Sequence, residues 1–227
     1  MSAPRTRGTV RLLARLAVRL LARVSVTGRE NLPPGGPLLV VFNHLGHMDA
    51  AVLIATLPYD ADAIALSDLY RVPITGQMLR LYGTIPVHRD AFDRAVLERA
   101  HAVLNRGGVL ILAPEARMSV TGSLEKARGG AAYLALKTKT PILPVALTGT
   151  WNPTFYGELK KLRRPRVTLT IGRVFHLPDL PVEGAERRQS IAQASSLIMA
   201  RIAGLLPPSY RGVYADIAEN EYSVIRS

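Results

Sequence analysis

The stretch from Asn43 to Asp49 places an imidazole and a carboxylate at a spacing that suits proton transfer. The apolar run before it, residues 37–42, predicts a buried strand, and residues 49–55 predict the first turns of a buried helix. A carboxylate at the start of that helix can accept a hydrogen bond from one ring nitrogen of His44, which leaves the other ring nitrogen free as a base. The stretch therefore predicts a general base, His44, that Asp49 orients.

Two other interpretations of this stretch stay open on spacing alone. Asp49 stands where the N-cap of the helix is expected, and aspartate is common there for structural reasons. His44 and His47 could instead be two ligands of a metal ion. The chain has no cysteine, and a third ligand would have to come from elsewhere in the sequence. We expect neither a metal ion nor a cofactor.

The composition describes a folded chain with a strong positive charge. Its 227 residues are 48% apolar and 20% charged, which indicates one domain with a substantial core. The absence of cysteine excludes disulfides, thiolate metal sites and a cysteine acyl-enzyme. The net charge of +12 favours an anionic partner, such as a phosphorylated substrate, anionic lipid or nucleic acid. We expect no nucleic-acid partner, because aromatic and basic residues are not interleaved and no recognition motif occurs.

Residues 7–24 have the pattern of a basic amphipathic helix. Arginines recur every four residues on one side (Arg11, Arg15, Arg19 and Arg23), and leucines cover the other (Leu12, Leu13, Leu16, Leu20 and Leu21). Such a helix can lie in a membrane interface with its arginines among lipid phosphates, or it can pack its leucines on the domain core with its arginines in water. We favour the membrane, because the polar face carries only cations.

This interpretation divides the chain into a membrane-docking helix, residues 1–24, and a catalytic domain, residues 25–227. No run of about 18 uninterrupted apolar residues occurs, so hydropathy predicts no transmembrane helix. Arginines also interrupt the apolar core that a secretory signal would need. We therefore expect a peripheral or monotopic protein on the cytoplasmic face of the cell membrane, with the anionic membrane surface as a partner.

Strand and helix patterns alternate along the chain, which predicts an α/β fold with a largely parallel or mixed central sheet flanked by helices. Strands are predicted at residues 24–28, 37–42, 61–66, 83–90, 109–113, 141–147 and 167–171. Further helices are predicted at residues 74–82, 92–106, 129–137 and 186–205. We find no internal repeat and no low-complexity segment.

Polar side chains follow three of the predicted strands. His44 with Asp49 follows one strand, Arg89 ends another, and Glu115 with Arg117 follows a third. The carboxyl ends of strands in an open α/β sheet are where ligands bind. Arginines there could hold a phosphate while the base takes a proton from a nearby hydroxyl, which suits acyl transfer to a phosphorylated alcohol. A structural Glu115–Arg117 ion pair and a solvated Arg89 are the alternatives.

Four segments in this order resemble the motifs of the glycerolipid acyltransferases, the lysophosphatidic acid acyltransferase family. The segments are Asn43, His44 and Asp49 (N-H-x4-D), Gly83 to Arg89, Pro114 to Ser119, and Ile142 to Val145. The resemblance covers about residues 24–214. The third segment departs from the usual P-E-G-T-R-S, because Ala116 replaces glycine and Arg117 follows Glu115 by two residues instead of three. The departure bears on the acceptor headgroup, since this motif helps to bind it.

The resemblance implies that His44 deprotonates an acceptor hydroxyl, with Asp49 orienting it, and that no covalent enzyme intermediate forms. The substrate-binding residues it implies are Asn43, Gly83, Arg89, Glu115 and Arg117. The donor would be acyl-CoA or acyl-carrier protein, and the acceptor a lysophospholipid. The acceptor that fits the family best is 1-acyl-sn-glycerol-3-phosphate, which would give phosphatidic acid. A non-catalytic peripheral module that binds anionic lipid is the alternative function.

Basic residues outside these motifs form a second feature with two interpretations. They are Lys126, Arg128, Lys160, Lys161, Arg163, Arg164 and Arg166. They could attract anionic lipid or the nucleotide phosphates of the donor, or they could be a solvated face.

Overall fold

The computed structural model describes residues 6–88 and 94–216, which form a central sheet covered by helices on both faces. The strands are β1 (Arg23–Thr27), β2 (Leu38–Phe42), β3 (Asp62–Leu66), β4 (Ile85–Val87), β5 (Val109–Leu112), β6 (Ile142–Thr148) and β7 (Arg166–Ile171). The described strands form one seven-stranded sheet in the order β1-β7-β6-β2-β5-β3-β4. All neighbouring pairs are parallel except β6 and β7, which are antiparallel. The predicted α/β fold with a mixed sheet is therefore confirmed.

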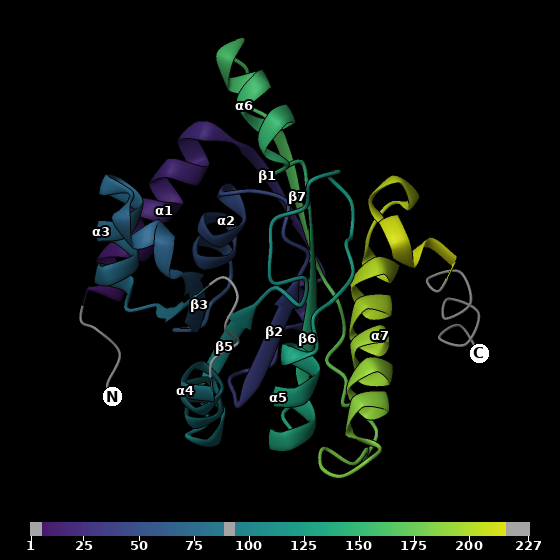
Figure 1. Ribbon diagram of the computed structural model, residues 1–227. Coiled ribbons are helices and arrows are strands. Elements are labelled where there is room, and N and C mark those ends of the chain that lie inside the picture. The colour runs from purple at the N-terminus through teal and green to yellow at the C-terminus, as the bar shows by residue number, and fades with distance from the viewer. Residues whose placement is uncertain (1–5, 89–93, 217–227) are drawn as a thin grey trace.

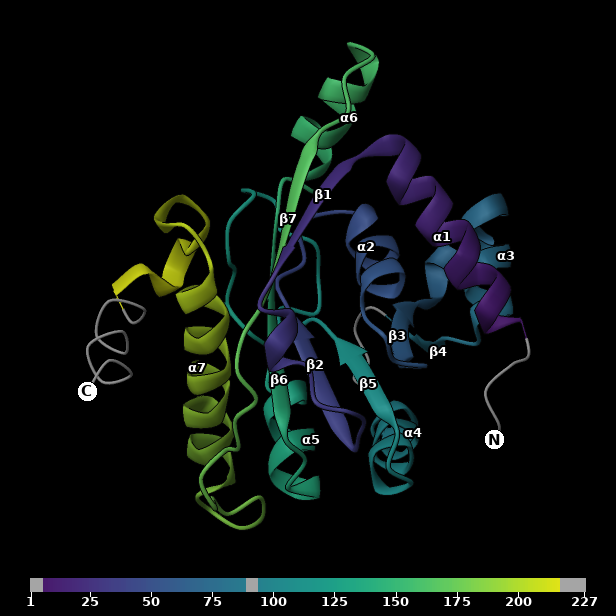
Figure 2. The same cartoon turned by 180° about the vertical axis from the view of Figure 1, so that it is seen from behind.

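The helices lie in two layers. They are α1 (Arg7–Leu21), α2 (Met48–Thr56), α3 (Pro73–Tyr82), α4 (Arg94–Asn105), α5 (Gly130–Thr138), α6 (Asn152–Lys160) and α7 (Arg187–Leu205). Short 3-10 turns occupy Arg29–Asn31, Ser67–Arg71, Pro208–Tyr210 and Gly212–Tyr214. Residues of α4, α5 and α7 build the core on one face of the sheet, and residues of α1, α2 and α6 build it on the other. Figures 1 and 2 show α1, α2 and α3 on the side of the sheet opposite α7.

The central strands form where the sequence is apolar without interruption. Every residue of β2 and of β5 is buried, because both faces of these strands are covered by helices. β7 instead alternates between buried and less buried residues, as its period of two predicts. Apolar patterning thus determines which strands lie in the middle of the sheet.

Helix α6 is an element that the sequence pattern did not predict. Its Pro153 stands at the start of the helix, where the missing N–H is tolerated, but its sequence lacks an apolar stripe. Phe155 is its buried residue and joins the core of the α1 and α2 face. The helix extends beyond the edge of the sheet (Figures 1 and 2).

Helix α1 packs on the domain through a narrow face of small residues. Val10, Ala14 and Val18 are buried, whereas its exposed large apolar residues are Leu12, Leu13, Leu16 and Leu20. The alternative in which the leucines pack on the core is therefore wrong. The leucines form an exposed apolar strip, which we call the leucine face.

The arginines of α1 also differ from the sequence prediction. Arg7 is buried, and its guanidinium contacts Asp60 at 3.3 Å and Asp62 at 2.6 Å. Arg11 donates to the carbonyl oxygen of Leu57 at 2.7 Å, and Arg15 to that of Ala55 at 3.2 Å. These carbonyls lie at the C-terminal end of α2, where helix carbonyls lack partners and cations are favoured. Arg7 is thus held inside the domain, whereas Arg11 and Arg15 each bind it through one nitrogen and keep further N–H donors.

Candidate active site

The loop between β2 and α2 brings His44 and Asp49 together. Oδ2 of Asp49 lies 2.8 Å from Nδ1 of His44, and it accepts hydrogen bonds from the backbone N–H groups of Leu45 at 2.7 Å and Gly46 at 2.8 Å. Asp49 is fully buried, with 0% of its side chain exposed. It lies in the first turn of α2, whose N-cap is His47, so Asp49 is not the cap. Its carboxylate instead fixes the loop that carries the imidazole.

This geometry selects one ring nitrogen of His44 as the basic atom. A carboxylate that accepts from Nδ1–H fixes the tautomer in which Nε2 has the free lone pair. The side chain of His44 is 28% exposed, so the ring can be reached from solvent. Phe42 packs its ring edge-on against the imidazole, with 5.7 Å between the ring centroids. The pair can therefore act as a general base toward a hydroxyl supplied by a substrate.

Glu115 joins this loop to the segment that follows β5. Its Oε2 accepts the backbone N–H of His44 at 2.7 Å, and its Oε1 accepts that of Glu125 at 2.7 Å. Burial raises the pKa of Glu115 to about 7, against the lowering effect of these two N–H donors. Ser119 donates its backbone N–H to the carbonyl oxygen of His44 at 2.7 Å. The peptide groups on both sides of His44 are thus held by one segment, and Glu115 positions the base.

Arg117 has a partner that the sequence did not predict. Its Nε lies 2.9 Å from Oε2 of Glu125, and its side chain is about half exposed. The alternative of a structural Glu115–Arg117 ion pair is therefore wrong. A guanidinium has five N–H donors, so the contact through Nε leaves others that suit a phosphate. Ala116, between the two motif residues, adopts the left-handed conformation with φ of 54°, so the missing glycine does not prevent this turn.

Two predicted substrate-binding residues have structural roles. Asn43 is buried, donates from Nδ2 to the carbonyl oxygen of Leu147 at 2.8 Å and accepts the backbone N–H of Leu147 at 2.7 Å. It joins the end of β2 to β6, and a substrate contact of Asn43 stays a prediction. Gly83 ends α3 with φ of 76°, a conformation that glycine favours. A substrate-binding role for Gly83 stays a prediction, and Arg89 lies outside the described residues.

Gly46 and Asn152 belong to the site although the sequence pattern did not select them. Asn152, at the start of α6, accepts the backbone N–H of His47 on its Oδ1 at 3.0 Å. A Cβ on Gly46 would lie 2.2 Å from the carbonyl oxygen of Thr150, so only glycine lets these two loops meet. For Gly46 the signal was its place inside the N-H-x4-D motif. Asn152 gave no signal, because its helix was not predicted.

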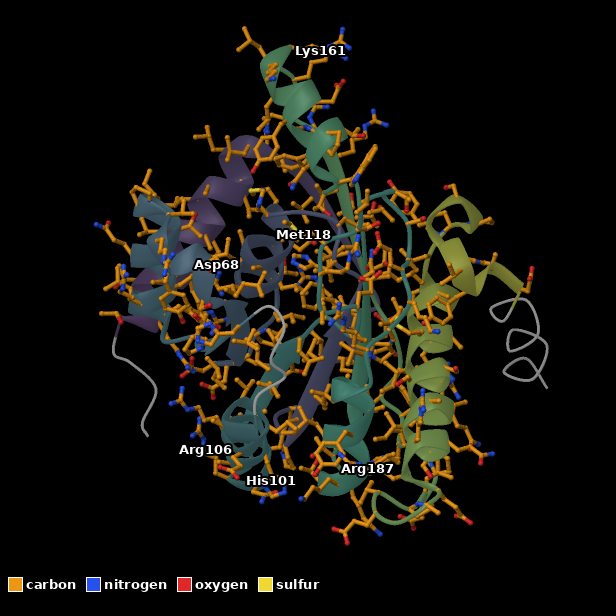
Figure 3. The ribbon with its side chains drawn as sticks, viewed as in Figure 1. Asp68, His101, Arg106, Met118, Lys161 and Arg187 are labelled. Atoms are coloured by element: carbon orange, nitrogen blue, oxygen red, sulfur yellow. The ribbon has the colours of Figure 1, made fainter. Side chains whose placement is uncertain are left out.

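The described site residues meet at one end of the sheet, as the strand pattern predicts. β2 and β5 are parallel neighbours, so the segments after them emerge side by side. Met118, in the segment after β5, lies at the end of the sheet nearest α6, whereas His101 of α4 lies at the opposite end (Figure 3). His47 directs its ring toward Tyr156, with 6.3 Å between the centroids. Within residues 6–88 and 94–216, no group of three or more histidines, aspartates and glutamates could hold a metal ion.

Several known proteins with similar sequences are named 1-acyl-sn-glycerol-3-phosphate acyltransferases. The 1-acyl-sn-glycerol-3-phosphate acyltransferase LPAT1 of Arabidopsis thaliana, a chloroplastic protein, is 27% identical over 190 residues, which are 82% of this chain and 53% of the relative. The 1-acyl-sn-glycerol-3-phosphate acyltransferase of Borreliella burgdorferi is 31% identical over 132 residues, which are 57% of this chain and 53% of the relative. The chain thus spans about half the length of these relatives.

A solved structure shares the fold, and a family model matches the region of the site. The crystal structure is the 1-acyl-sn-glycerophosphate (LPA) acyltransferase PlsC of Thermotoga maritima, with a TM-score of 0.62 and 24% identity over 86% of this chain and 80% of that one. The acyltransferase family model matches residues 23–148, which contain the N-H-x4-D stretch and the segment around Glu115. The match covers more than half of the 227 residues. The motif resemblance is confirmed, and the chain belongs to the acyltransferase family.

Proposed function

We propose that this protein transfers a fatty acyl group from an acyl thioester to the free hydroxyl of a lysophospholipid. The observation that carries the proposal is the 2.8 Å contact between Nδ1 of His44 and the buried carboxylate of Asp49. The acceptor we propose is 1-acyl-sn-glycerol-3-phosphate, which would give phosphatidic acid. The names of the relatives from Arabidopsis thaliana and Borreliella burgdorferi support this acceptor. A purely lipid-binding module would not need the His44–Asp49 pair.

The reaction requires one base and no covalent enzyme intermediate. Nε2 of His44 takes the proton of the acceptor hydroxyl while the oxygen attacks the carbonyl carbon of the thioester. The carbon–sulfur bond then breaks, and the leaving thiolate takes the proton back from the imidazolium. The Asp49 carboxylate stabilises the imidazolium in between and holds the ring in place. Arg117, and Arg89 by sequence, would bind the acceptor phosphate.

The chemical part of the proposal is tested by His44→Ala with His47→Ala as the matched control. Both histidines lie in the same loop, but only His44 contacts Asp49 through its ring. Thiol release from acyl-CoA or acyl-carrier protein is measured with lysophosphatidic acid present, and the two donors are compared side by side. We expect a fall of about a hundred- to ten-thousand-fold for His44→Ala and near-normal turnover for His47→Ala. Normal turnover in His44→Ala would refute the assignment of His44 as the general base. A loss of turnover in His47→Ala alone would assign that role to His47.

We also propose that α1 docks the protein on an anionic membrane, on its cytoplasmic face, with residues 1–24 as the docking segment. The leucine face supports this, because a contiguous exposed apolar strip on a helix marks an interaction surface. Ile74 and Leu81 of α3, which packs beside α1, are exposed as well. Among the described helices, none has the length and apolar character that crossing a bilayer requires. Leu16→Gln should weaken flotation with anionic vesicles, and unchanged flotation would refute this docking mode.

A further inference from the structure

The loop between α6 and β7 forms an exposed basic tip, residues 160–166. Leu162 at its centre is 96% exposed and has φ of 57°, so the chain presents a large apolar side chain outward at a strained turn. Lys160, Lys161 and Arg163 flank it, and all three are exposed. Figure 3 shows Lys161 at the far end of α6, away from the rest of the domain. An apolar residue ringed by cations fits the interface of an anionic bilayer, where each part finds a favourable environment.

The basic tip is fixed to α1. A terminal nitrogen of Arg164 (Nη2) donates to the carbonyl oxygens of Arg19 at 2.5 Å and Ala22 at 2.6 Å. These carbonyls lie at the C-terminal end of α1, where partners for helix carbonyls are otherwise missing. Leu20 of the leucine face, next to Arg19, is 74% exposed. The tip and the leucine face are therefore parts of one connected surface.

The charges beside the tip also favour a bound anion. Arg23 of β1 and Arg166 of β7 are directly paired neighbours in parallel strands, and both are exposed. Like charges at paired positions of a sheet repel each other, and a bound anionic surface would offset this. Arg7 is buried in the domain. The tip and its neighbours therefore add exposed cations to those that α1 itself presents, such as Arg15 and Arg19.

We infer that the basic tip is a second membrane contact, in which Leu162 inserts among the headgroups of anionic lipids and its flanking cations bind their phosphates. The inference rests on the proposed docking of α1 and adds a second point of contact to it. Two contacts fix the orientation of a protein on a surface, whereas a single helix allows rotation about its axis. The nine residues of α6 span about 14 Å at 1.5 Å per residue. Its first residue, Asn152, contacts His47, so the tip would hold the active-site loop at a set distance from the bilayer.

The chain has no cysteine, so a single introduced cysteine can carry an environment-sensitive fluorophore. We would label Leu162→Cys, Leu20→Cys and, as a control, Val213→Cys, which replaces a residue that is 68% exposed on another part of the surface. Each protein is mixed with phosphatidylcholine vesicles with and without phosphatidylglycerol, and separately with acyl-carrier protein. We expect a blue shift at positions 162 and 20 with the anionic vesicles, and none at position 213.

The outcomes separate the inference from the proposed function. A blue shift at position 20 without one at 162 would overturn the second contact and leave docking through α1 intact. No shift at either position would refute membrane docking altogether. A shift at 162 with carrier protein, and none with vesicles, would overturn the inference by identifying the tip as a protein-binding surface.

A matched pair of unlabelled variants measures the strength of the contact. Leu162→Gln should weaken partitioning to anionic vesicles about tenfold, because one large apolar side chain no longer leaves water. Val213→Gln should leave partitioning unchanged. Turnover of a short-chain, monomeric lysophosphatidic acid should be equal in both variants, which shows that the chemistry is intact. Equal partitioning of Leu162→Gln and the unsubstituted protein would overturn the inference.

Discussion

Replacing Glu115 with glutamine tests whether a buried carboxylate holds the catalytic loop. Its two oxygens accept the backbone N–H groups of His44 and Glu125, each at 2.7 Å, and the residue is 1% exposed. A carboxamide has one acceptor and one donor group, so one of these N–H groups would face an N–H donor. We expect Glu115→Gln to shift the peptide of His44 and to lower turnover, while the protein still folds.

The pH dependence of the free energy of unfolding follows from the pKa of Glu115, which burial raises from 4.5 to about 7. Between these values the folded protein binds a proton that the unfolded chain does not bind, so its stability falls as pH rises. Each pKa unit corresponds to about 1.4 kcal/mol, which gives about 3 kcal/mol in full. Between about pH 5 and about pH 8 the loss is about 2–3 kcal/mol. Glu115→Gln lacks this titration, and its amide resembles the protonated carboxyl.

The assay is urea unfolding of both proteins across this pH range. The free energy of unfolding of the unsubstituted protein, minus that of Glu115→Gln, should fall by about 2–3 kcal/mol from about pH 5 to about pH 8. A difference that does not change with pH would mean that folded and unfolded Glu115 bind the same number of protons, so that folding does not raise its pKa. A difference that grows with pH would mean that the N–H donors outweigh burial. Either result would refute the reasoning.

Three further substitutions test other contacts. Asp49→Asn should lower turnover about a hundred- to ten-thousand-fold, because the neutral amide no longer stabilises the imidazolium of His44; equal thiol release would contradict this. Arg7→Met should lower the free energy of unfolding by up to about 3 kcal/mol, since the buried Asp62 loses one of its two arginine partners, each 2.6 Å away; an unchanged thermal midpoint would contradict it. Ala116→Gly should raise the free energy of unfolding by up to about 1 kcal/mol, because φ of 54° strains alanine; a loss of stability in urea would show that the turn is not strained.

The sequence alone determined the elements whose partners are close along the chain. His44 and Asp49 are five residues apart, so a strand end and a helix start bring them together whatever the rest of the fold does. The central strands followed from uninterrupted apolar runs, because a strand buried on both faces has no polar side. The alternation of strands and helices predicted a site at strand ends, but only the structure shows that β2 and β5 are parallel neighbours. The His44–Asp49 spacing and the apolar runs are local patterns, so they can be recognised in the sequence before the fold is known.

The tertiary structure decided every contact between distant segments. Glu115 is 71 residues from His44, and nothing in its motif shows that it binds a backbone N–H instead of an arginine. For α1, periodicity defined an arginine side and a leucine side, but not which of them meets the domain. The small residues Val10, Ala14 and Val18 pack on the domain, and the arginines beside them bind Asp60, Asp62 and the carbonyls at the end of α2. Such complementary groups become neighbours only once the chain has folded.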